Sequence, residues 1–272
     1  MIGIGIFLLN KYLAFKEVLN YESIGRDGAA EMTLEEDIHL ALLANEPVFV
    51  TDIGHIRSPK LRDVIKLGYS SYMDSLSSLL FDKSRISGLG EVPESGFVLA
   101  CYFFMQNDHF RNSFSNGIQL LLQKEIELVD AEEAPYFNLG DGMTLHEGNF
   151  QRFQEIVKIA NKAELADDKE NYNPGNSKAK EMIEKLMKGK ANKPAKKPVM
   201  NLHSIISGLS WKSTSGINIH NIFELSIYQF YDGYYRLENI DHYNSVVTGI
   251  YTGNIDAKKI NMQEINWTKI IY

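Results

Sequence analysis

The residues of this chain most able to do chemistry are its seven histidines and the acidic residues beside them. A metal site needs ligands at a fixed spacing, such as two histidines four residues apart on one helix face. The histidine and acid combinations present are Asp37 with His39, Asp52 with His55, Asp108-His109 and Asp241-His242. None of them has a second histidine at that spacing. We therefore predict no metal site.

Other catalytic patterns are also missing from the sequence. It contains no Gly-x-Ser-x-Gly elbow, and Gly88-Leu89-Gly90 lacks the rest of a nucleotide-binding loop. The single cysteine, Cys101, lies in the apolar run Leu99–Phe104, which favours a buried small hydrophobic residue over a nucleophile. The paired acids Glu35-Glu36 and Glu132-Glu133 are explained by solvation at a helix start and in a loop. We predict no catalytic residue, no cofactor and no enzymatic activity.

The composition sets broad limits on the function. Of the 272 residues, 44% are hydrophobic, which is enough for a substantial core. A net charge of −7 disfavours a general nucleic-acid-binding protein, whose surface is normally basic. The apolar segment Ile2–Leu9 is far shorter than a membrane helix, which needs roughly 20 residues. We expect a soluble protein of the cytoplasm that does not contact a membrane.

Helical spacing of apolar residues predicts most of the elements that would position functional side chains. Helices are expected to begin at Thr33 within a capping box, at Pro59 with Ser58 as cap, and at Asp108 as cap. Further apolar segments expected to be helical or buried are 97–105 and 150–160. Strands are expected at 48–50 and 126–129, with a hairpin that joins 136–139 to 143–145. The predicted fold class is mainly α with a minor antiparallel β element, in a two-part helical architecture.

A change in composition predicts the division into parts. Residues 189–198 contain four lysines, two prolines and no large apolar side chain, which is typical of a flexible spacer. The preceding segment 178–188 has the apolar stripe of a short charged helix. We predict an N-terminal, mostly helical domain at 1–165, a charged Lys/Pro-rich linker at 166–200, and a C-terminal aromatic-rich helical module at 201–272.

The C-terminal module contains a dense aromatic segment. Apolar residues recur in steps of three and four over 219–240, which predicts a long helix, and tyrosines between them widen its apolar surface. Most of these side chains are expected to pack within the module, while some tyrosines stay exposed and contact a partner. The candidate partner-binding residues are Tyr228, Tyr231, Tyr234, Tyr235, Tyr251, Trp211 and Trp267.

Two segments of the chain together carry a family resemblance. The first runs from Ile53 to Tyr69 and leads into Tyr72–Leu76. The second runs from Asn221 to Asp232 and leads to the Thr-Gly-Ile-Tyr-Thr-Gly sequence at 248–253 and to 256–260. In aromatic order and in this six-residue sequence, the chain resembles the tail assembly chaperones of long-tailed bacteriophages and their prophages.

The resemblance implies a non-enzymatic, mostly helical protein of the host cytoplasm that is absent from the mature virion. Its expected partners are the phage tape measure protein and the tail tube protein, and self-association is also open. Two alternatives remain. One is a structural tail or connector protein retained in the virion. The other is a nucleic-acid-associated regulator that acts through the lysines of Lys178–Lys197, although the net charge makes nucleic acid a less favoured partner.

Overall fold

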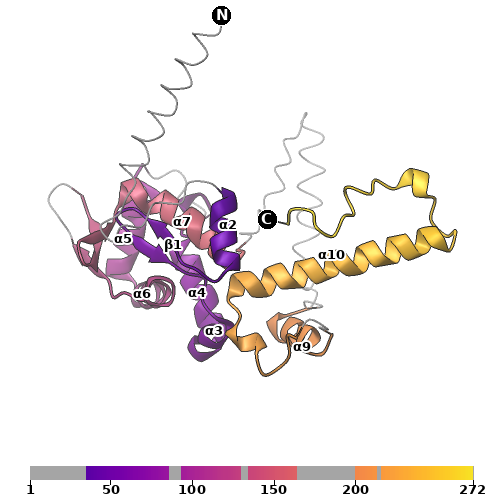
Figure 1. Cartoon of the computed structure of the whole chain (residues 1–272). Helices are drawn as coiled ribbons and strands as arrows, with labels where there is room; N and C mark the ends of the chain where they lie inside the picture. The colour runs from indigo at the N-terminus through magenta and orange to yellow at the C-terminus, as the bar shows by residue number, and fades with distance from the viewer. Residues whose placement is uncertain (1–34, 86–92, 130–133, 164–199, 213–215, 272) are drawn as a thin grey trace, which may run out of the picture. The chain divides into compact units, whose positions relative to one another are not determined.

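The protein is described from a computed structural model of residues 1–272 (Figure 1). The structure describes residues 35–85, 93–129, 134–163, 200–212 and 216–271. The predicted cap Thr33, the apolar segment Ile2–Leu9, the charged helix 178–188 and nearly all of the linker lie outside these residues.

The described residues are mainly helical, and this confirms the predicted fold class. The helices are α2 (Glu35–Leu43), α3 (Leu61–Leu67), α4 (Tyr69–Leu79), α5 (Gly96–Gln106), α6 (Asp108–Leu122), α7 (Glu147–Asn161), α9 (Leu202–Lys212) and α10 (Ile227–Tyr251). Short 3₁₀ turns occur at Lys83–Arg85, Ile222–Glu224 and Ala257–Lys259.

Two small antiparallel sheets make up the minor β element. Strands β1 (Val48–Val50) and β2 (Gly54–Ile56) form a hairpin in which Val48 pairs with Ile56. The second sheet has the order β3 (Glu127–Val129), β4 (Tyr136–Gly140) and β5 (Met143–Leu145). The strands that the alternation of residues predicts are therefore confirmed, including the hairpin between β4 and β5.

The second predicted helix start is wrong by two residues. Helix α3 begins at Leu61, while Ser58 and Pro59 precede it as buried chain outside any helix. The chain turns at Gly68, whose φ of +91° lies in a region that glycine tolerates best, and this turn separates α3 from α4. The Ser58 hydroxyl does not cap α3, because it accepts a hydrogen bond from the Tyr228 amide at 2.9 Å.

The core of the N-terminal part is formed by buried side chains from the helices α2 to α7 and from both sheets. Helix α6 is capped by Asn107, whose Oδ1 accepts from the Phe110 amide at 3.0 Å, so the prediction of Asp108 as the cap is off by one residue. Cys101 is buried, as the sequence predicts. Helix α5 is buried along one face only, because Tyr102 is 53% exposed.

The long C-terminal helix is shifted relative to the prediction. Helix α10 begins at Ile227 rather than Ile219 and continues to Tyr251. Ser226 begins it with a capping box, since its hydroxyl accepts from the Gln229 amide and the Gln229 side chain accepts from the Ser226 amide. A helix of 25 residues is about 37 Å long.

The described chain falls into two compact units. One contains the residues up to Ala163 together with Phe223–Tyr272, and the other lies within Glu164–Ile222. Helix α10 therefore belongs with the N-terminal part, whereas α9 belongs to the second unit. The predicted domain boundaries at 165 and 200 stay a prediction, because they fall next to or within the segment outside the described residues.

Candidate functional site

The beginning of α10 is joined to the N-terminal part by backbone hydrogen bonds. The Ile227 amide donates to the Pro59 carbonyl at 2.8 Å, and the Leu61 amide donates to the Leu225 carbonyl at 2.9 Å. These bonds flank an isolated antiparallel bridge between Lys60 and Ser226. Segments more than 160 residues apart in sequence are therefore held in a fixed register.

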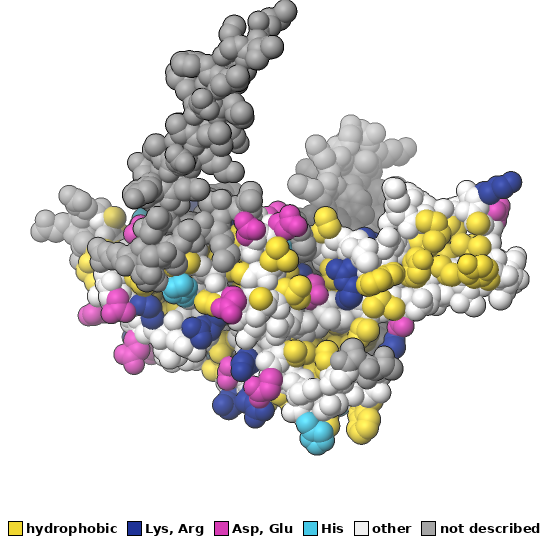
Figure 2. Space-filling view, viewed as in Figure 1, with side chains coloured by type: hydrophobic (Ala, Val, Ile, Leu, Met, Phe, Trp, Pro, Cys, Tyr) yellow, Lys and Arg dark blue, Asp and Glu magenta, His cyan; other side chains and the backbone are white. Residues whose placement is uncertain are grey.

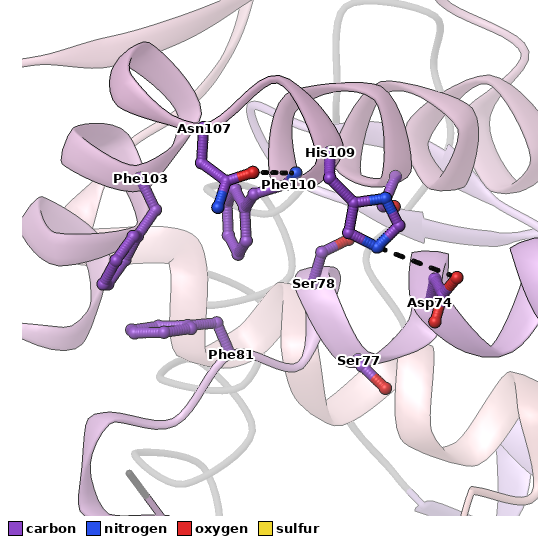
Figure 3. Close-up of a pocket in the computed structure, with 9 residues that line it drawn as sticks. Asp74, Ser77, Ser78, Phe81, Phe103, Asn107, His109 and Phe110 are labelled. Carbon is purple, nitrogen blue, oxygen red and sulfur yellow. Dashed lines mark hydrogen bonds and ion pairs between the residues drawn. The ribbon is translucent and has the colours of Figure 1, made fainter.

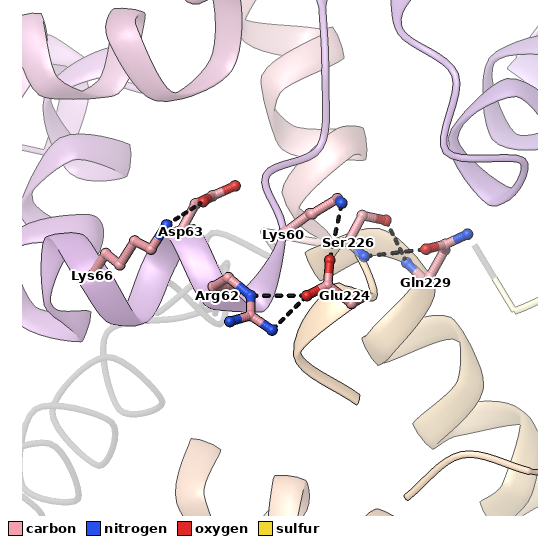
Figure 4. Close-up of polar contacts among 7 residues, drawn as sticks. All are labelled: Lys60, Arg62, Asp63, Lys66, Glu224, Ser226 and Gln229. Carbon is pink, nitrogen blue, oxygen red and sulfur yellow. Dashed lines mark hydrogen bonds and ion pairs between the residues drawn. The ribbon is translucent and has the colours of Figure 1, made fainter. Parts of the chain in front are cut away.

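Beside this junction, Glu224 forms an ion-pair cluster with Lys60 and Arg62 (Figure 4). One carboxylate oxygen of Glu224 accepts from Lys60 Nζ at 3.1 Å, and the other accepts from Arg62 Nε at 2.8 Å. The hydrogen bonds from these two side chains lower the pKa of the Glu224 carboxyl. Because all three side chains are exposed or partly exposed, the cluster fixes the local arrangement more than it stabilises the fold.

The first turn of α10 buries Tyr228 against α2. The Tyr228 hydroxyl lies 2.7 Å from His39 Nδ1, and Lys162 Nζ at the end of α7 lies 4.5 Å from the centre of the Tyr228 ring. Only 2% of Tyr228 and 6% of His39 are exposed. Burial, and then the charge of Lys162, lower the pKa of His39 from its usual 6.5, although Glu35 and Asp232 act in the opposite direction. Neutral imidazole is therefore the form that fits this junction.

The burial of His39 predicts a stability that depends on pH. The unfolded chain binds a proton on His39 near pH 6.5, whereas the folded chain resists it. The contribution of His39 to the free energy of unfolding is therefore fully present above about pH 6.5. It decreases as the pH falls toward the lowered pKa of His39 in the folded state. Urea denaturation of the wild type should give a lower free energy of unfolding at about pH 5.5 than at about pH 7.5. In His39→Gln, the difference between the two pH values should be smaller. His109→Gln, at an exposed position, should leave it intact. If His39→Gln loses as much stability as the wild type on acidification, the assignment is wrong.

Four tyrosines from α4 and α10 lie together and form a tyrosine cluster, composed of Tyr69, Tyr72, Tyr231 and Tyr235. The rings of Tyr69 and Tyr72 are 6.3 Å apart, and those of Tyr231 and Tyr235 are stacked at 6.4 Å. Burial and the neighbouring phenol groups of Tyr69 and Tyr235 raise the pKa of Tyr231 to about 12. The two outer members remain accessible, with Tyr69 46% and Tyr235 39% exposed.

A further exposed side chain extends this surface along α4. Met73 is 42% exposed and follows Tyr69 by four residues, so the two share one helix face. Tyrosine and methionine both suit contacts with varied apolar partners. The spacing of Tyr69 and Met73 could have been read from the sequence, but their exposure depends on how α4 and α10 meet.

The far end of α10 carries a second exposed apolar area. Figure 2 shows hydrophobic side chains spread over this end of the helix and the C-terminal segment. The segment is tied to the helix by Arg236, which donates to the carbonyl oxygens of Trp267 and Lys269. Exposed hydrophobic residues in this part of the chain are Tyr251, Met262, Trp267 and Ile270.

The predicted partner-binding residues fall in several different places. Burial removes Tyr228 from any surface that a partner could reach, because its ring fills the space between α2, α7 and α10. Tyr231 and Tyr234 are half-buried, and the Tyr234 hydroxyl donates to Glu238 at 2.8 Å. Trp211, on α9 of the other compact unit, is 81% exposed. Within the larger compact unit, the candidates therefore range from fully buried to exposed.

An apolar pocket that the sequence analysis did not find lies among α4, α5 and α6 (Figure 3). It has a volume of about 340 Å³, and three phenylalanine rings form its wall, those of Phe81, Phe103 and Phe110. His109 and Asp74 lie at one side, with 3.8 Å between His109 Nε2 and an Asp74 oxygen. The pocket could accept one apolar side chain of a partner.

Residues of the other histidine and acid combinations contact neighbouring side chains of the protein. The Asp108 carboxylate accepts from Arg111 at 2.6 Å, and the His55 ring packs 5.3 Å from that of Phe49. Within the described ranges, no three His, Cys, Asp or Glu side chains are placed to hold a metal ion. In the same part of the chain, no helix combines the length and the hydropathy required to cross a bilayer.

The chain is similar to one known protein family over its C-terminal part. No curated protein and no solved structure matches the chain. Residues 192–272, however, match the model of a protein family described as the YomV second domain. The match begins in the predicted linker and contains the whole predicted C-terminal module. This family is phage-associated, and the match indicates a phage protein.

Proposed function

We propose that this chain is a phage tail assembly chaperone. In this proposal it binds the tape measure protein in the host cytoplasm, recruits tail tube subunits and has no enzymatic activity. The match of residues 192–272 to a phage-associated family supports a phage context. The resemblance of 53–76 and 221–260 to tail assembly chaperones supports the finer assignment.

The observation that carries the proposal is the exposed apolar surface beside the junction of α4 and α10. Tyr69, Met73 and Tyr235 present aromatic and thioether groups that are 39–46% exposed. Apolar surface contributes about 25 cal/mol for each Å² that is buried, so a few such side chains give a contact that is favourable yet reversible. A chaperone needs such contacts, because it must cover apolar helices of its client and later release them.

Co-expression with the tape measure protein tests the proposal. The complex is expected to be soluble and to co-purify, while the tape measure protein alone aggregates. The double variant Tyr69→Ala/Tyr235→Ala should weaken co-purification by about tenfold, since both side chains would contribute to a contact centre. Tyr102→Ala/Met105→Ala, which removes two exposed apolar side chains from α5, is the matched control and should bind normally.

Two results would contradict the proposal. One is a tape measure protein that is equally soluble with and without this chain and does not associate with it. The other is stoichiometric recovery of the chain in purified virions by mass spectrometry, which would instead indicate a structural tail protein.

A further inference from the structure

A second pocket lies beside the Glu224 ion-pair cluster and has a different character from the apolar one. It has a volume of about 440 Å³, within the range of small-molecule sites. Three cationic side chains line it, those of Arg57, Lys60 and Arg62, and we call it the basic pocket. Its other walls come from the loop after α2, from Leu120 and Gln123 at the end of α6, and from Asp63 and Glu224.

Arg57 is the distinctive group of the basic pocket. Its backbone is fixed by the bond from the Arg57 amide to the Leu121 carbonyl at 3.0 Å, which places the residue beside the end of α6. Its Nε is buried and makes no hydrogen bond, and no carboxylate of the described residues forms an ion pair with the guanidinium. A buried donor that lacks an acceptor is costly, so a ligand that supplies one gains affinity.

The charges of the basic pocket favour an anion. Glu224 is shared between Lys60 and Arg62, and Asp63 lies 4.0 Å from Lys66, which is outside the pocket wall. The positive charge of Arg57 is thus uncompensated in the described structure. Guanidinium groups bind phosphate through paired N–H donors, and lysine adds a point charge. The wall contains no aromatic ring on which a base could stack.

We propose that the basic pocket binds the phosphate group of a small molecule, with Arg57 as its principal ligand. The phosphate would accept from the guanidinium of Arg57 and compete with Glu224 for Lys60 and Arg62. Because Glu224 belongs to the segment that leads into α10, occupancy of the pocket would be coupled to the attachment of that segment to α3.

Calorimetric titration of the full chain with phosphate, pyrophosphate and a nucleoside monophosphate tests this proposal. Sodium acetate at matched ionic strength is the control for a general salt effect. Arg57→Gln should weaken binding by about tenfold or more. Glu224→Gln should strengthen it several-fold, because the competing carboxylate is gone. Lys66→Gln removes a cation that lies on α3 outside the pocket, and it should change affinity by less than about twofold. Circular dichroism and thermal unfolding confirm that each variant is folded.

Arg57→Gln and Lys66→Gln each remove one positive charge, so a much larger effect of Arg57→Gln distinguishes a phosphate site in the pocket from general electrostatic attraction. Equal binding of pyrophosphate and the nucleotide would mean that the pocket recognises phosphate alone, and tighter binding of the nucleotide would add contacts to the nucleoside. Both results support the proposal. It would be overturned if no probe binds at about 5 mM, if Arg57→Gln binds like the wild type, or if Glu224→Gln binds more weakly. Binding of DNA or RNA without binding of the small phosphates would also overturn it.

Discussion

Replacing Tyr228 with alanine is expected to destabilise the protein by about 3–5 kcal/mol, the usual cost of removing a fully buried aromatic ring. The ring is 2% exposed, and it contacts both the imidazole of His39 and the ammonium group of Lys162. Its loss leaves a cavity where α2, α7 and α10 meet. Urea denaturation followed by circular dichroism measures the change in the free energy of unfolding.

Tyr235→Ala is the matched control, because it makes the same kind of truncation in the same helix at a position that is 39% exposed. We expect it to cost less than about 1 kcal/mol. Tyr228→Phe should lie between the two at about 1 kcal/mol, since it removes only the hydroxyl group that lies 2.7 Å from His39. If Tyr228→Ala and Tyr235→Ala cost the same, α10 is not anchored through its first turn.

Phe114→Ala, in the middle of α6, is expected to have a comparable effect of about 3–5 kcal/mol. The Phe114 side chain is 0% exposed and is stacked on Phe137 of β4, with ring centres 5.0 Å apart. It also meets Phe104 of α5 edge to face at 5.9 Å. Removing the ring therefore opens a cavity between two helices and the second sheet. The midpoint of thermal unfolding provides the measurement.

A control for this variant exists on α5. Tyr102→Ala removes a ring of similar size that is 53% exposed, and it should change the unfolding free energy by less than about 1 kcal/mol. Phe114→Leu should recover much of the stability lost in Phe114→Ala, since it refills part of the cavity. An unchanged midpoint in Phe114→Ala would contradict the packing of α6 on β4.

The apolar spacing of the N-terminal part is sufficient to predict most of its helices. Helices α2, α6 and α7 each have an apolar stripe that faces the core of the N-terminal part. In these helices the residues that the sequence spacing predicts to be buried are the ones that pack in the core. The β4–β5 hairpin is equally predictable, because the sequence Gly140-Asp141-Gly142 marks its turn. Both glycines take positive φ angles there, which glycine tolerates best. These elements are local, so short stretches of sequence contain the information that specifies them.

The start of α10 shows where local reading is insufficient. The steps of three and four continue upstream to Ile219 and conceal the true beginning at Ile227. The capping box of Ser226 and Gln229 is a local signal that could have corrected this. By contrast, Ser58 has the sequence setting of a helix cap, and only the tertiary structure shows that its hydroxyl accepts from Tyr228.

The candidate sites were less predictable than the fold. Sequence identifies the tyrosines of α10, but their exposure depends on which of them meet α4 and α2. Tyr228 and Tyr235 are therefore indistinguishable by composition and opposite in burial. The basic pocket depends on the closing of the 57–62 segment against Glu224, which is more than 160 residues away, so no local pattern could reveal it.

The anchoring of α10 has a consequence for synthesis of the chain on the ribosome. Tyr228 is translated 65 residues after Ala163, the last residue of the N-terminal part of this compact unit. At roughly 5–20 residues per second, this interval lasts about 3–13 s. Throughout that time His39 and the Ser58 hydroxyl lack the contacts that the first turn of α10 supplies. The N-terminal part of this unit must therefore wait for α10 before the buried contacts of Tyr228 can form.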